Sequence, residues 1–535
     1  MLSALIWIPV LGAALIGFWP GSLNPSRSRL FALVVTGITL IWTAVLGIQF
    51  EPGNAGLQFQ EHLPWIESLG LTYKLGLDGL SLPLVVLNSL LTWIAIYSSE
   101  KSVNRPRFYY TLVLLLNTGV AGAFLAQNLL LFFLFYELEL IPLYFLIAIW
   151  GGSRRGYAAT KFLIYTAVSG ILILAAFMGL TWLSGSSSFD YQPLLAQALP
   201  LGQQFLLLGA LLVGFGIKIP LVPFHTWLPD AHVEASTPVS VLLAGVLLKL
   251  GTYGLLRFGL GLFPEAWVAL APVLATWAVV SVLYGAFTAI AQKDMKKMVA
   301  YSSIGHMGYV LLAAAAATPL SLLASVFQMI SHGLISALLF LLVGVVYQKT
   351  GSRDLDVLRG LLNPERGLPL IGSLMVLGVM ASAGIPGMVG FISEFLVFRG
   401  SFPVFPLQTL LCMIGTGLTA VYFLLLVNRA FFGRLSEQVL LPPIEWFDRT
   451  PSIILATLIV ILGLQPGWMV RWSETTTATL MPTRLARVAT PTASADAQVS
   501  STTSHAEEDS PVRGFRRYRK MDVGLSVAIP KEYQQ

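Results

Sequence analysis

Long apolar runs constrain this chain more than any other feature of its sequence. A helix needs roughly 20 mostly apolar residues to cross a bilayer, and about fourteen such runs fit between Met1 and Trp472. We place them near residues 2–20, 29–49, 78–98, 108–127, 129–149, 161–183, 204–222, 237–259, 266–290, 298–317, 321–346, 368–398, 404–431 and 452–471. Only 11% of the residues are charged, whereas soluble domains carry about 25%. The sequence therefore predicts an all-α polytopic membrane protein.

Cysteine content narrows the possible chemistry. The one cysteine, Cys412, lies inside an apolar run and is expected to serve packing. A single thiol cannot build a disulfide framework, an iron–sulfur cluster or a thiolate metal site. The sequence also has no nucleotide-binding loop and no nucleophile elbow, so we expect no cofactor and no metal in this chain. The first apolar run lacks a basic leading segment, which favours a retained helix over a signal peptide.

Basic residues mark alternate connections between the apolar runs. They include Arg27, Arg29, Lys101, Arg105, Arg107, Arg154, Arg155, Lys293, Lys296, Lys297, Lys349, Arg353, Arg359, Arg366, Arg429 and Arg434. The positive-inside rule places these connections in the cytoplasm and the N-terminus on the opposite side. The net charge of +6 is thus a topology signal and gives no reason to expect nucleic acid as a partner.

Ionisable side chains within the apolar runs are the candidates for function. Each costs about 2.5–3.5 kcal/mol at mid-helix, and such residues usually face the bundle interior or a wet path. The set is Glu137, Glu139, Lys218, Lys249, Glu394, His306 and His332. One of them alone would suit a structural ion pair, but this set spans five or six helices. Buried acids and amines titrate nearer neutrality and as a coupled set, so together they predict a proton relay.

Three of these positions need a choice. Glu137 and Glu139 are two residues apart and face about 200° apart on a continuous helix, and we favour Glu137 for the path. His332 is flanked by Ser331 and Gly333, which leave room for water, so we expect it in the relay. His306 lies near the cytoplasmic start of its run and suits a helix-capping or loop-anchoring role as well as a relay member.

Two apolar runs contain helix breakers. Ile219-Pro220 interrupts the seventh run and Ile385-Pro386 the twelfth, each near an ionisable residue. Irregular backbone at membrane depth survives only beside protein or water. Because paired breaks five helices apart indicate a repeat, we predict two inverted five-helix units with discontinuous helices 7 and 12. The predicted parts are residues 1–107, 108–260 (first repeat), 261–432 (second repeat), 433–472 (helix 14) and the polar tail 473–535.

The segment HTWLPDAHVEAS at 225–236 is rich in titratable groups, including His225, Asp230, His232 and Glu234. Its spacing does not match HExxH. We expect a proline-rich, hydrogen-bonded connection, with an ion entrance as the alternative. The tail carries the basic cluster RGFRRYRK at 513–520, which we expect to lie on neighbouring subunits or on anionic lipid.

Four motifs resemble the antiporter-like subunits of complex I: KIPLVPFHTWLPDAHVEAS, QKDMKKMVAYSSIGHMGY, ISHGLISALLF and GIPGMVGFISEF. The resemblance covers about residues 75–470. Within that group, YELELIPLYFLIAIWGG and GLDGLSLPLVVLNSLL look most like the chain 4 family of the cyanobacterial and chloroplast NAD(P)H-quinone oxidoreductase complex, which is similar to bacterial subunit M. The resemblance implies a proton-translocating membrane-arm subunit with fourteen helices.

It also implies roles for single residues and for the surroundings of the chain. The relay would consist of Glu137 paired with Lys218, then Lys249, His332 and Glu394, with His306 as a further candidate. Plastoquinone, iron–sulfur clusters and NAD(P)H or ferredoxin would be bound by other subunits. Partners would be chain 5-like and chain 2-like antiporter-like subunits and lipids, in a thylakoid membrane with the N-terminus on the lumenal side.

Three other functions stay open at this point. The same lysine–glutamate set occurs in subunits of multi-subunit Na⁺/H⁺ antiporters. His306 and His332 on successive helices are also compatible with a haem- or quinone-binding electron-transfer subunit. A passive structural spacer is the third alternative.

Overall fold

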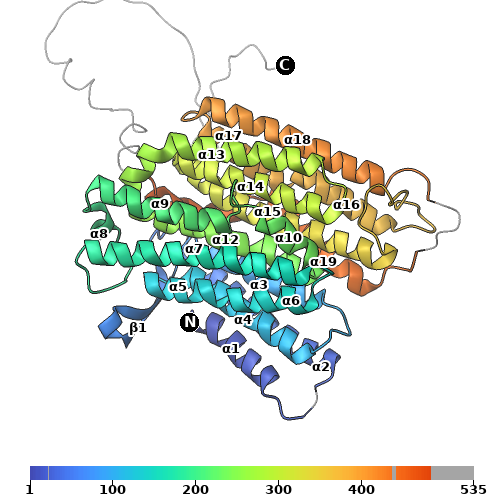
Figure 1. Cartoon of the computed structure of the whole chain (residues 1–535), viewed down its shortest axis with the longest axis horizontal. Helices are drawn as coiled ribbons and strands as arrows, with labels where there is room; N and C mark the ends of the chain where they lie inside the picture. The colour runs from blue at the N-terminus through green and yellow to red at the C-terminus, as the bar shows by residue number, and fades with distance from the viewer. Residues whose placement is uncertain (22, 436–440, 483–535) are drawn as a thin grey trace, which may run out of the picture. The chain divides into compact units, whose positions relative to one another are not determined.

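Helices make up almost all of the regular structure in the computed structural model, which describes residues 1–21, 23–435 and 441–482. The chain divides into two units, Met1–Leu485 and Ala486–Gln535, and every described residue belongs to the first. Within that unit the helices are packed side by side along a common direction (Figure 1). Their bounds are α1 Ser3–Gly17, α2 Pro25–Gln49, α3 Leu82–Tyr97, α4 Pro106–Leu125, α5 Leu129–Leu138, α6 Leu140–Trp150, α7 Arg155–Leu183, α8 Pro193–Gln197, α9 Leu201–Lys218, α10 Trp227–Glu234, α11 Thr237–Leu242, α12 Leu248–Gly254, α13 Pro264–Ile290, α14 Met295–Ala316, α15 Pro319–Thr350, α16 Pro369–Ser382, α17 Val389–Ser401, α18 Pro406–Ala430, α19 Trp446–Leu464 and α20 Gly467–Thr479.

The membrane-spanning class predicted from the sequence is confirmed. In the described part of the chain, 11 helical segments are long and apolar enough to cross a bilayer. Three shorter apolar helices, Ser3–Gly17, Leu82–Tyr97 and Pro369–Ser382, occupy the remaining predicted runs. Each predicted run therefore corresponds to a helix.

A β-hairpin interrupts the otherwise helical order between α2 and α3. Its strands β1 (Gln58–Ile66) and β2 (Leu71–Leu77) pair antiparallel, with Glu61 opposite Leu75 and Leu63 opposite Tyr73. Asp190, from the connection after α7, accepts hydrogen bonds from Thr72 at 2.6 Å and Lys74 at 3.0 Å. The sequence reasoning did not anticipate this hairpin.

Both predicted helix breaks are present. Helix α9 ends at Lys218, and the chain turns through Pro220 and Pro223 before α10 begins at Trp227. Helix α16 ends at Ser382, and α17 begins at Val389. Between them Gly384 and Gly387 have φ values of +69° and +93°, which favour glycine because it has no Cβ.

The segment 225–236, expected to be an irregular connection, is mostly helical. Its residues Trp227–Glu234 form α10, which packs against α7 and α14. Proline at position 229 lies in the first turn of this helix, where it is tolerated because that turn's N–H groups lack intrahelical partners. The expected proline-rich, hydrogen-bonded connection thus contains a short helix, with hydrogen bonds from Trp227 Nε1 to the Ile217 carbonyl and from Ser240 Oγ to the His232 carbonyl.

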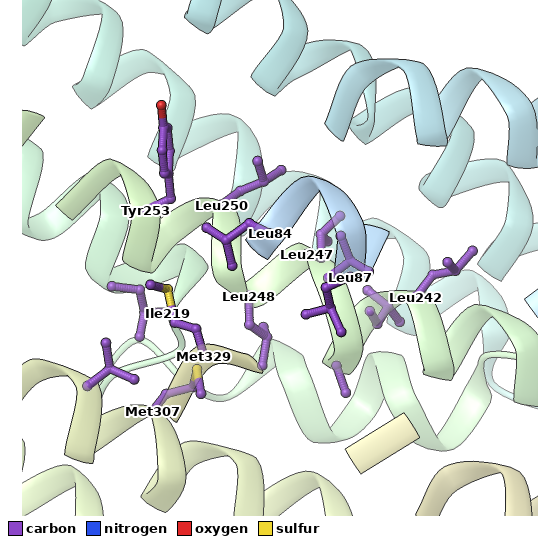
Figure 2. Close-up of a cluster of buried hydrophobic side chains, with 14 of the residues drawn as sticks. Leu84, Leu87, Ile219, Leu242, Leu247, Leu248, Leu250, Tyr253, Met307 and Met329 are labelled. Atoms are coloured by element: carbon purple, nitrogen blue, oxygen red, sulfur yellow. The ribbon is translucent and has the colours of Figure 1, made fainter. Parts of the chain in front are cut away.

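The eighth spanning segment was expected to be one regular helix, but it changes pitch twice. Two π-helical turns, η2 (Leu243–Leu247) and η3 (Leu255–Leu260), alternate with α11 and α12. Figure 2 shows how the leucines of this segment pack with Leu84, Leu87, Met307 and Met329 in the buried core. Single π turns inside α-helices are frequent at functional sites.

The last described helix lies partly beyond the predicted end of helix 14. Helix α20 runs from Gly467 to Thr479, and Ser473, Thr476 and Thr477 are buried within it. The polar tail expected from residue 473 thus begins as a packed helix. The basic cluster at 513–520 lies outside the described residues. The two inverted repeats and the boundaries of the five predicted parts stay predictions.

Candidate functional site

Lys218 is buried beside a break in its own helix and forms an ion pair with Glu139. Lys218 is 1% exposed and Glu139 0% exposed. The ammonium also lies 4.7 Å from the centre of the Tyr136 ring, a cation–π distance. The expected partner was Glu137, so this part of the prediction was wrong. Lys218 is the last residue of α9, and its charge is favourable next to unpaired carbonyls at a helix end.

The helix carrying the two glutamates breaks at Glu139. This residue ends α5 and precedes α6, with φ −76° and ψ −20°. Sequence reasoning assumed one continuous helix, in which only one of two residues spaced by two faces the path. The φ and ψ of Glu139 stay close to helical values, and of the two acids it is Glu139 whose carboxylate pairs with Lys218. Its second carboxylate oxygen, Oε2, has no hydrogen-bond partner in the described part of the chain.

Glu137 occupies a separate position two residues earlier, about half a helical turn round from Glu139. It is half-buried, and its carboxylate lies against Gly170 of α7, where an added Cβ would overlap it. Lys218 also interacts electrostatically with Glu137. One lysine therefore has two carboxylates in its surroundings, of which Glu139 forms the ion pair.

Lys249 and His332 make direct contact. The Lys249 Nζ lies 2.8 Å from His332 Nδ1, and it donates a hydrogen bond of 2.5 Å to the carbonyl of Ala244 in the π-helical turn η2. An ammonium can only donate, so Nδ1 accepts and a neutral His332 ring carries its proton on Nε2. His332 Nε2 is buried and has no partner among the residues that the structure describes. Of the two His332 ring nitrogens, Nδ1 therefore contacts Lys249, whereas Nε2 is left without a partner in the described part of the chain.

His306 and Glu394 form a second contact. His306 Nε2 lies 3.7 Å from Glu394 Oε1, and Glu394 Oε2 accepts a hydrogen bond of 3.0 Å from Thr416. His306 Nδ1 lies 2.7 Å from the carbonyl of Ser302, which can only accept, so this nitrogen carries a proton. His306 lies in the middle of α14 and not near its start, because α14 begins at Met295. The helix-cap alternative for His306 was wrong.

A small cavity connects the two contacts. It measures about 10 Å³, close to the space that the centre of one water molecule occupies. Its polar lining comprises Ser302, His306, Gln328, Ser331, His332, Ser336, Ser382 and Glu394. The rings of His306 and His332 are 5.7 Å apart between centroids. This space is large enough for one water molecule but far too small for haem, which removes the haem-ligand alternative for this pair.

Apolar side chains separate Lys218 from Lys249. Among the described residues no hydrogen bond joins the two lysines, although Gly251 of α12 packs directly on Lys218. Ile219 and Leu248, each adjacent in sequence to one of the lysines, belong with Met307 and Met329 to the buried apolar cluster of Figure 2. The site therefore consists of two parts with apolar side chains between them. One part is the Lys218–Glu139 ion pair, and the other runs from Lys249 through His332 and His306 to Glu394.

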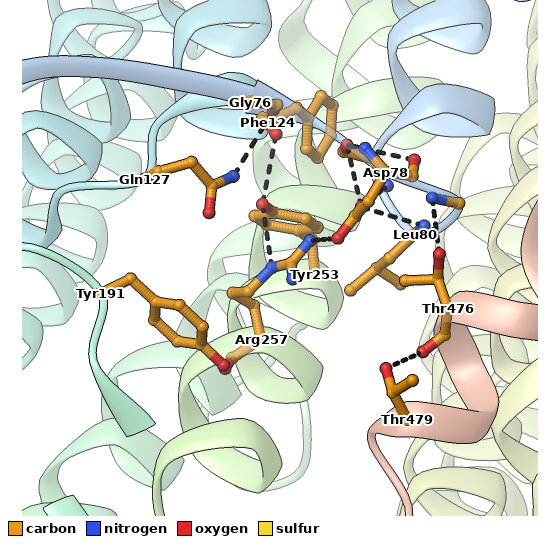
Figure 3. Close-up of polar contacts among 12 residues, drawn as sticks. Gly76, Asp78, Leu80, Phe124, Gln127, Tyr191, Tyr253, Arg257, Thr476 and Thr479 are labelled. Atoms are coloured by element: carbon orange, nitrogen blue, oxygen red, sulfur yellow. Dashed lines mark hydrogen bonds and ion pairs between the residues drawn. The ribbon is translucent and has the colours of Figure 1, made fainter. Parts of the chain in front are cut away.

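Sequence reasoning missed a buried ion pair between Arg257 and Asp78. Arg257 lies in the π-helical turn η3, and its guanidinium pairs with Asp78, which precedes α3. Arg257 Nε donates to the Tyr253 hydroxyl at 3.3 Å, and Gly79 N donates to Thr476 Oγ1 at 3.0 Å (Figure 3). Arg257 follows Lys249 by eight residues in the same apolar run, so the search for charges in apolar runs should have included it.

A protein-family model matches residues 126–419 of the chain. Its description is NADH:quinone oxidoreductase/Mrp antiporter, transmembrane. The matched range contains Glu137, Lys218, Lys249, His332 and Glu394, and it covers more than half of the chain.

Curated relatives are similar over most of their length. NAD(P)H-quinone oxidoreductase chain 4 1 of Synechococcus sp. (strain JA-3-3Ab) is 42% identical over 86% of this chain and 89% of the relative. NAD(P)H-quinone oxidoreductase chain 4 of Prochlorococcus marinus (strain NATL2A) is 40% identical over 86% of this chain and 88% of the relative.

Solved structures share the fold. A chain of respiratory complex I from Thermus thermophilus with bound NADH superimposes with a TM-score of 0.81 at 27% identity, covering 90% of this chain and 99% of that one. A chain of the Mrp complex from Dietzia sp. DQ12-45-1b superimposes with a TM-score of 0.78 at 22% identity, covering 90% and 97%, which shows a common fold.

Proposed function

The chain belongs to the NAD(P)H-quinone oxidoreductase chain 4 family of antiporter-like membrane subunits, and we propose that it translocates protons through a buried Glu/Lys/His relay. Electrons pass from NAD(P)H or ferredoxin to plastoquinone in other subunits, which also hold the iron–sulfur clusters. This chain contributes the proton path and no redox centre.

The observation that carries the proposal is the line from Lys249 through His332 to Glu394. Lys249 contacts His332 at 2.8 Å, His332 Nε2 has no partner among the described residues, and His332 and Glu394 both line the small polar cavity. A structural ion pair needs none of these features. A neutral histidine accepts a proton through one nitrogen and donates through the other, which suits transfer along this line.

The two halves of the site have different roles. While Glu139 pairs with Lys218, the ammonium is stabilised and holds its proton. When conformational or electrostatic change separates the pair, a desolvated Lys218 releases its proton, because an uncompensated buried charge is costly. Lys249 accepts this proton after passing its own proton to His332. The proton received by His332 then passes, with His306 and water in the cavity, to Glu394 and the far side of the membrane.

Glu137 acts as the second acid near Lys218. It is close enough to interact electrostatically with the ammonium, and it reaches this place because Gly170 has no side chain. One way to open the Lys218–Glu139 ion pair is a shift of the Lys218 ammonium toward Glu137. The ammonium then has one carboxylate partner before the shift and another after it.

The surroundings of the chain follow from its family. We propose chain 5-like and chain 2-like antiporter-like subunits as its neighbours in the membrane arm, together with lipids. The cyanobacterial relatives favour a thylakoid membrane. The basic connections face the cytoplasm and the N-terminus faces the lumen, as expected from the positive-inside rule.

The test measures proton uptake by membrane vesicles during quinone reduction, with the complex isolated in parallel to control for assembly. Glu394→Gln and Lys249→Met should assemble and lose proton translocation through this subunit. The control is Glu474→Gln, an acid in α20 far along the chain from the relay, which should behave as wild type.

Two outcomes would reject the proposal. Proton movement that follows an imposed sodium gradient without quinone reduction would favour the Na⁺/H⁺ antiporter alternative. Unchanged pumping in both Glu394→Gln and Lys249→Met would favour a passive spacer.

A further inference from the structure

His232 is a fully buried histidine whose ring nitrogens are both without a partner. It is 0% exposed, and neither Nδ1 nor Nε2 has a hydrogen-bond partner within the described ranges. The ring lies flat against Phe340 of α15, with centroids 4.4 Å apart and an interplanar angle of 9°. Buried polar atoms in proteins nearly always have a partner, in the protein or in water. A ring that only packs would gain nothing from two nitrogens at this place.

The inner side of His232 faces the relay. Phe340 lies on the same helix as His332, two turns or about 12 Å nearer the end of α15 that carries the basic connection. His232 interacts electrostatically with Lys249 and with His332.

The outer side of His232 is held by two cations from that side of the protein. Lys296, at the start of α14, is buried and donates a hydrogen bond of 2.5 Å to the carbonyl of Ala235. Arg353 donates a hydrogen bond of 3.0 Å to the carbonyl of Val233, the residue next to His232. Lys296 also interacts electrostatically with the His232 ring.

A large cavity opens beside these cations. It measures about 500 Å³, and its charged lining comprises Lys293, Asp294, Lys297, Arg353 and Asp354. Arg353 and Asp294 form an ion pair of 3.5 Å in its wall. Arg353, which bonds to the Val233 carbonyl of α10, therefore also lines this cavity.

We propose that His232 is the proton entry residue of this subunit. Water in the cavity at Asp294 and Arg353 supplies the proton, Lys296 lies between the cavity and the ring, and His232 passes the proton to the Lys249–His332 pair. One ring nitrogen gains a proton as the other releases one, so no other bond forms or breaks. This inference rests on the proposed function and adds the route by which protons reach its site.

The decisive variant is His232→Phe. It keeps a flat ring against Phe340 and removes both nitrogens, and because neither nitrogen has a partner in the described chain, a purely packing role predicts full function. Proton entry predicts that the complex assembles, but that protons translocated per quinone reduced fall as far as they do in Glu394→Gln. The matched control is Phe340→Leu, which weakens the ring contact, keeps the nitrogens and should pump as wild type.

Each result either supports or overturns the entry role of His232 or the proposed function. Normal pumping in His232→Phe, with pumping lost in Glu394→Gln, overturns the entry role and leaves the proposed function intact. Normal pumping in both variants rejects the proposed function itself. If His232→Phe does not assemble, His232→Gln replaces it, because glutamine forms hydrogen bonds but does not relay protons at neutral pH. Full pumping by His232→Gln would then overturn the inference.

Discussion

At the scale of single residues, the pairing of Lys218 with Glu139 distinguishes two neighbouring acids. Glu139 is fully buried and forms the ion pair, whereas Glu137 is half-buried and lies against α7. Removing one partner of a buried ion pair typically costs about 3–5 kcal/mol, because the other charge is left uncompensated. The two acids should therefore respond differently to the same substitution.

We expect Glu139→Gln to lower the thermal midpoint of the isolated complex and to reduce its proton translocation strongly. Glu137→Gln should leave the midpoint near wild type and reduce translocation only, because it does not form the main ion pair. Thermal unfolding and proton uptake measured on both variants check this. Equal loss of stability in both would contradict the assignment.

Gly170 provides a second residue-scale prediction. Replacing it with alanine places a methyl group where the Glu137 carboxylate lies, so Glu137 must move away from its place near Lys218. Gly170→Ala should reduce proton translocation without preventing assembly. Gly156→Ala on the same helix is the control, since nothing lies within 4 Å of an added Cβ there. Wild-type pumping in Gly170→Ala would show that the position of Glu137 is unimportant.

At the scale of elements, the half-helices α16 and α17 depend on one close approach. An added Cβ at Gly390 would overlap the carbonyl oxygen of Ala381, so alanine there forces the half-helices apart beside the polar cavity. We expect Gly390→Ala to destabilise the protein by about 1–3 kcal/mol, as overpacking typically does. Gly417→Ala in α18 meets nothing within 4 Å and should be neutral or slightly stabilising. Thermal unfolding of both variants is the measurement, and equal midpoints would contradict the prediction.

The β-hairpin gives a prediction about pH. Burial acts to raise the pKa of Asp190, but hydrogen bonds from Thr72, Asn128 and Lys74 outweigh it and hold this pKa below its usual range. A carboxyl with a depressed pKa stabilises the folded state above its ordinary pKa of about 3.9, and this stability is lost as pH falls through the lower folded value.

Limited proteolysis of the hairpin should thus be constant from neutral pH down to about pH 4 and increase below it. Asp190→Asn should raise cleavage at neutral pH, by an amount corresponding to about 1 kcal/mol after screening by solvent. Cleavage of the Asp190→Asn variant should change little as the pH falls. A wild-type hairpin whose cleavage already rises near pH 6 would contradict this.

The elements also show what the sequence could and could not predict. Proline and glycine mark both helix breaks, and charges in apolar runs mark Lys218, Lys249 and Glu394, because lipid tolerates neither without a reason. Helical spacing separated Glu137 from Glu139 but did not show which of them pairs with Lys218, because that depends on tertiary packing. The place of Glu137 on the proton path stays a prediction. The π-helical turns have no known sequence rule. The hairpin was missed because only runs of spanning length were considered.

At the scale of the whole described unit, the Asp78–Arg257 pair joins parts far apart in the chain. Asp78 precedes α3, Arg257 belongs to the eighth spanning segment, and the neighbouring Gly79 N–H bonds to Thr476 in α20 (Figure 3). The first and last described quarters of the chain therefore meet at one buried polar cluster.

We expect Arg257→Met alone to destabilise the protein by about 3–5 kcal/mol, because Asp78 is left as an unpaired buried charge. Asp78→Asn combined with Arg257→Met should cost clearly less than the sum of the single variants. A double-mutant cycle by thermal unfolding measures this coupling. Additive single effects would show that the pair contributes no coupling.

The number of charged groups in the proposed relay limits how many of them are ionised at once. Three carboxyl groups, Glu137, Glu139 and Glu394, share it with two amines, Lys218 and Lys249. If all five groups were ionised, the relay would carry one net negative charge in a medium that solvates charge poorly. Electroneutrality is reached when one of the three acids holds a proton. With both amines charged, balance therefore requires one proton on an acid, and each further proton that enters must be matched by one that leaves.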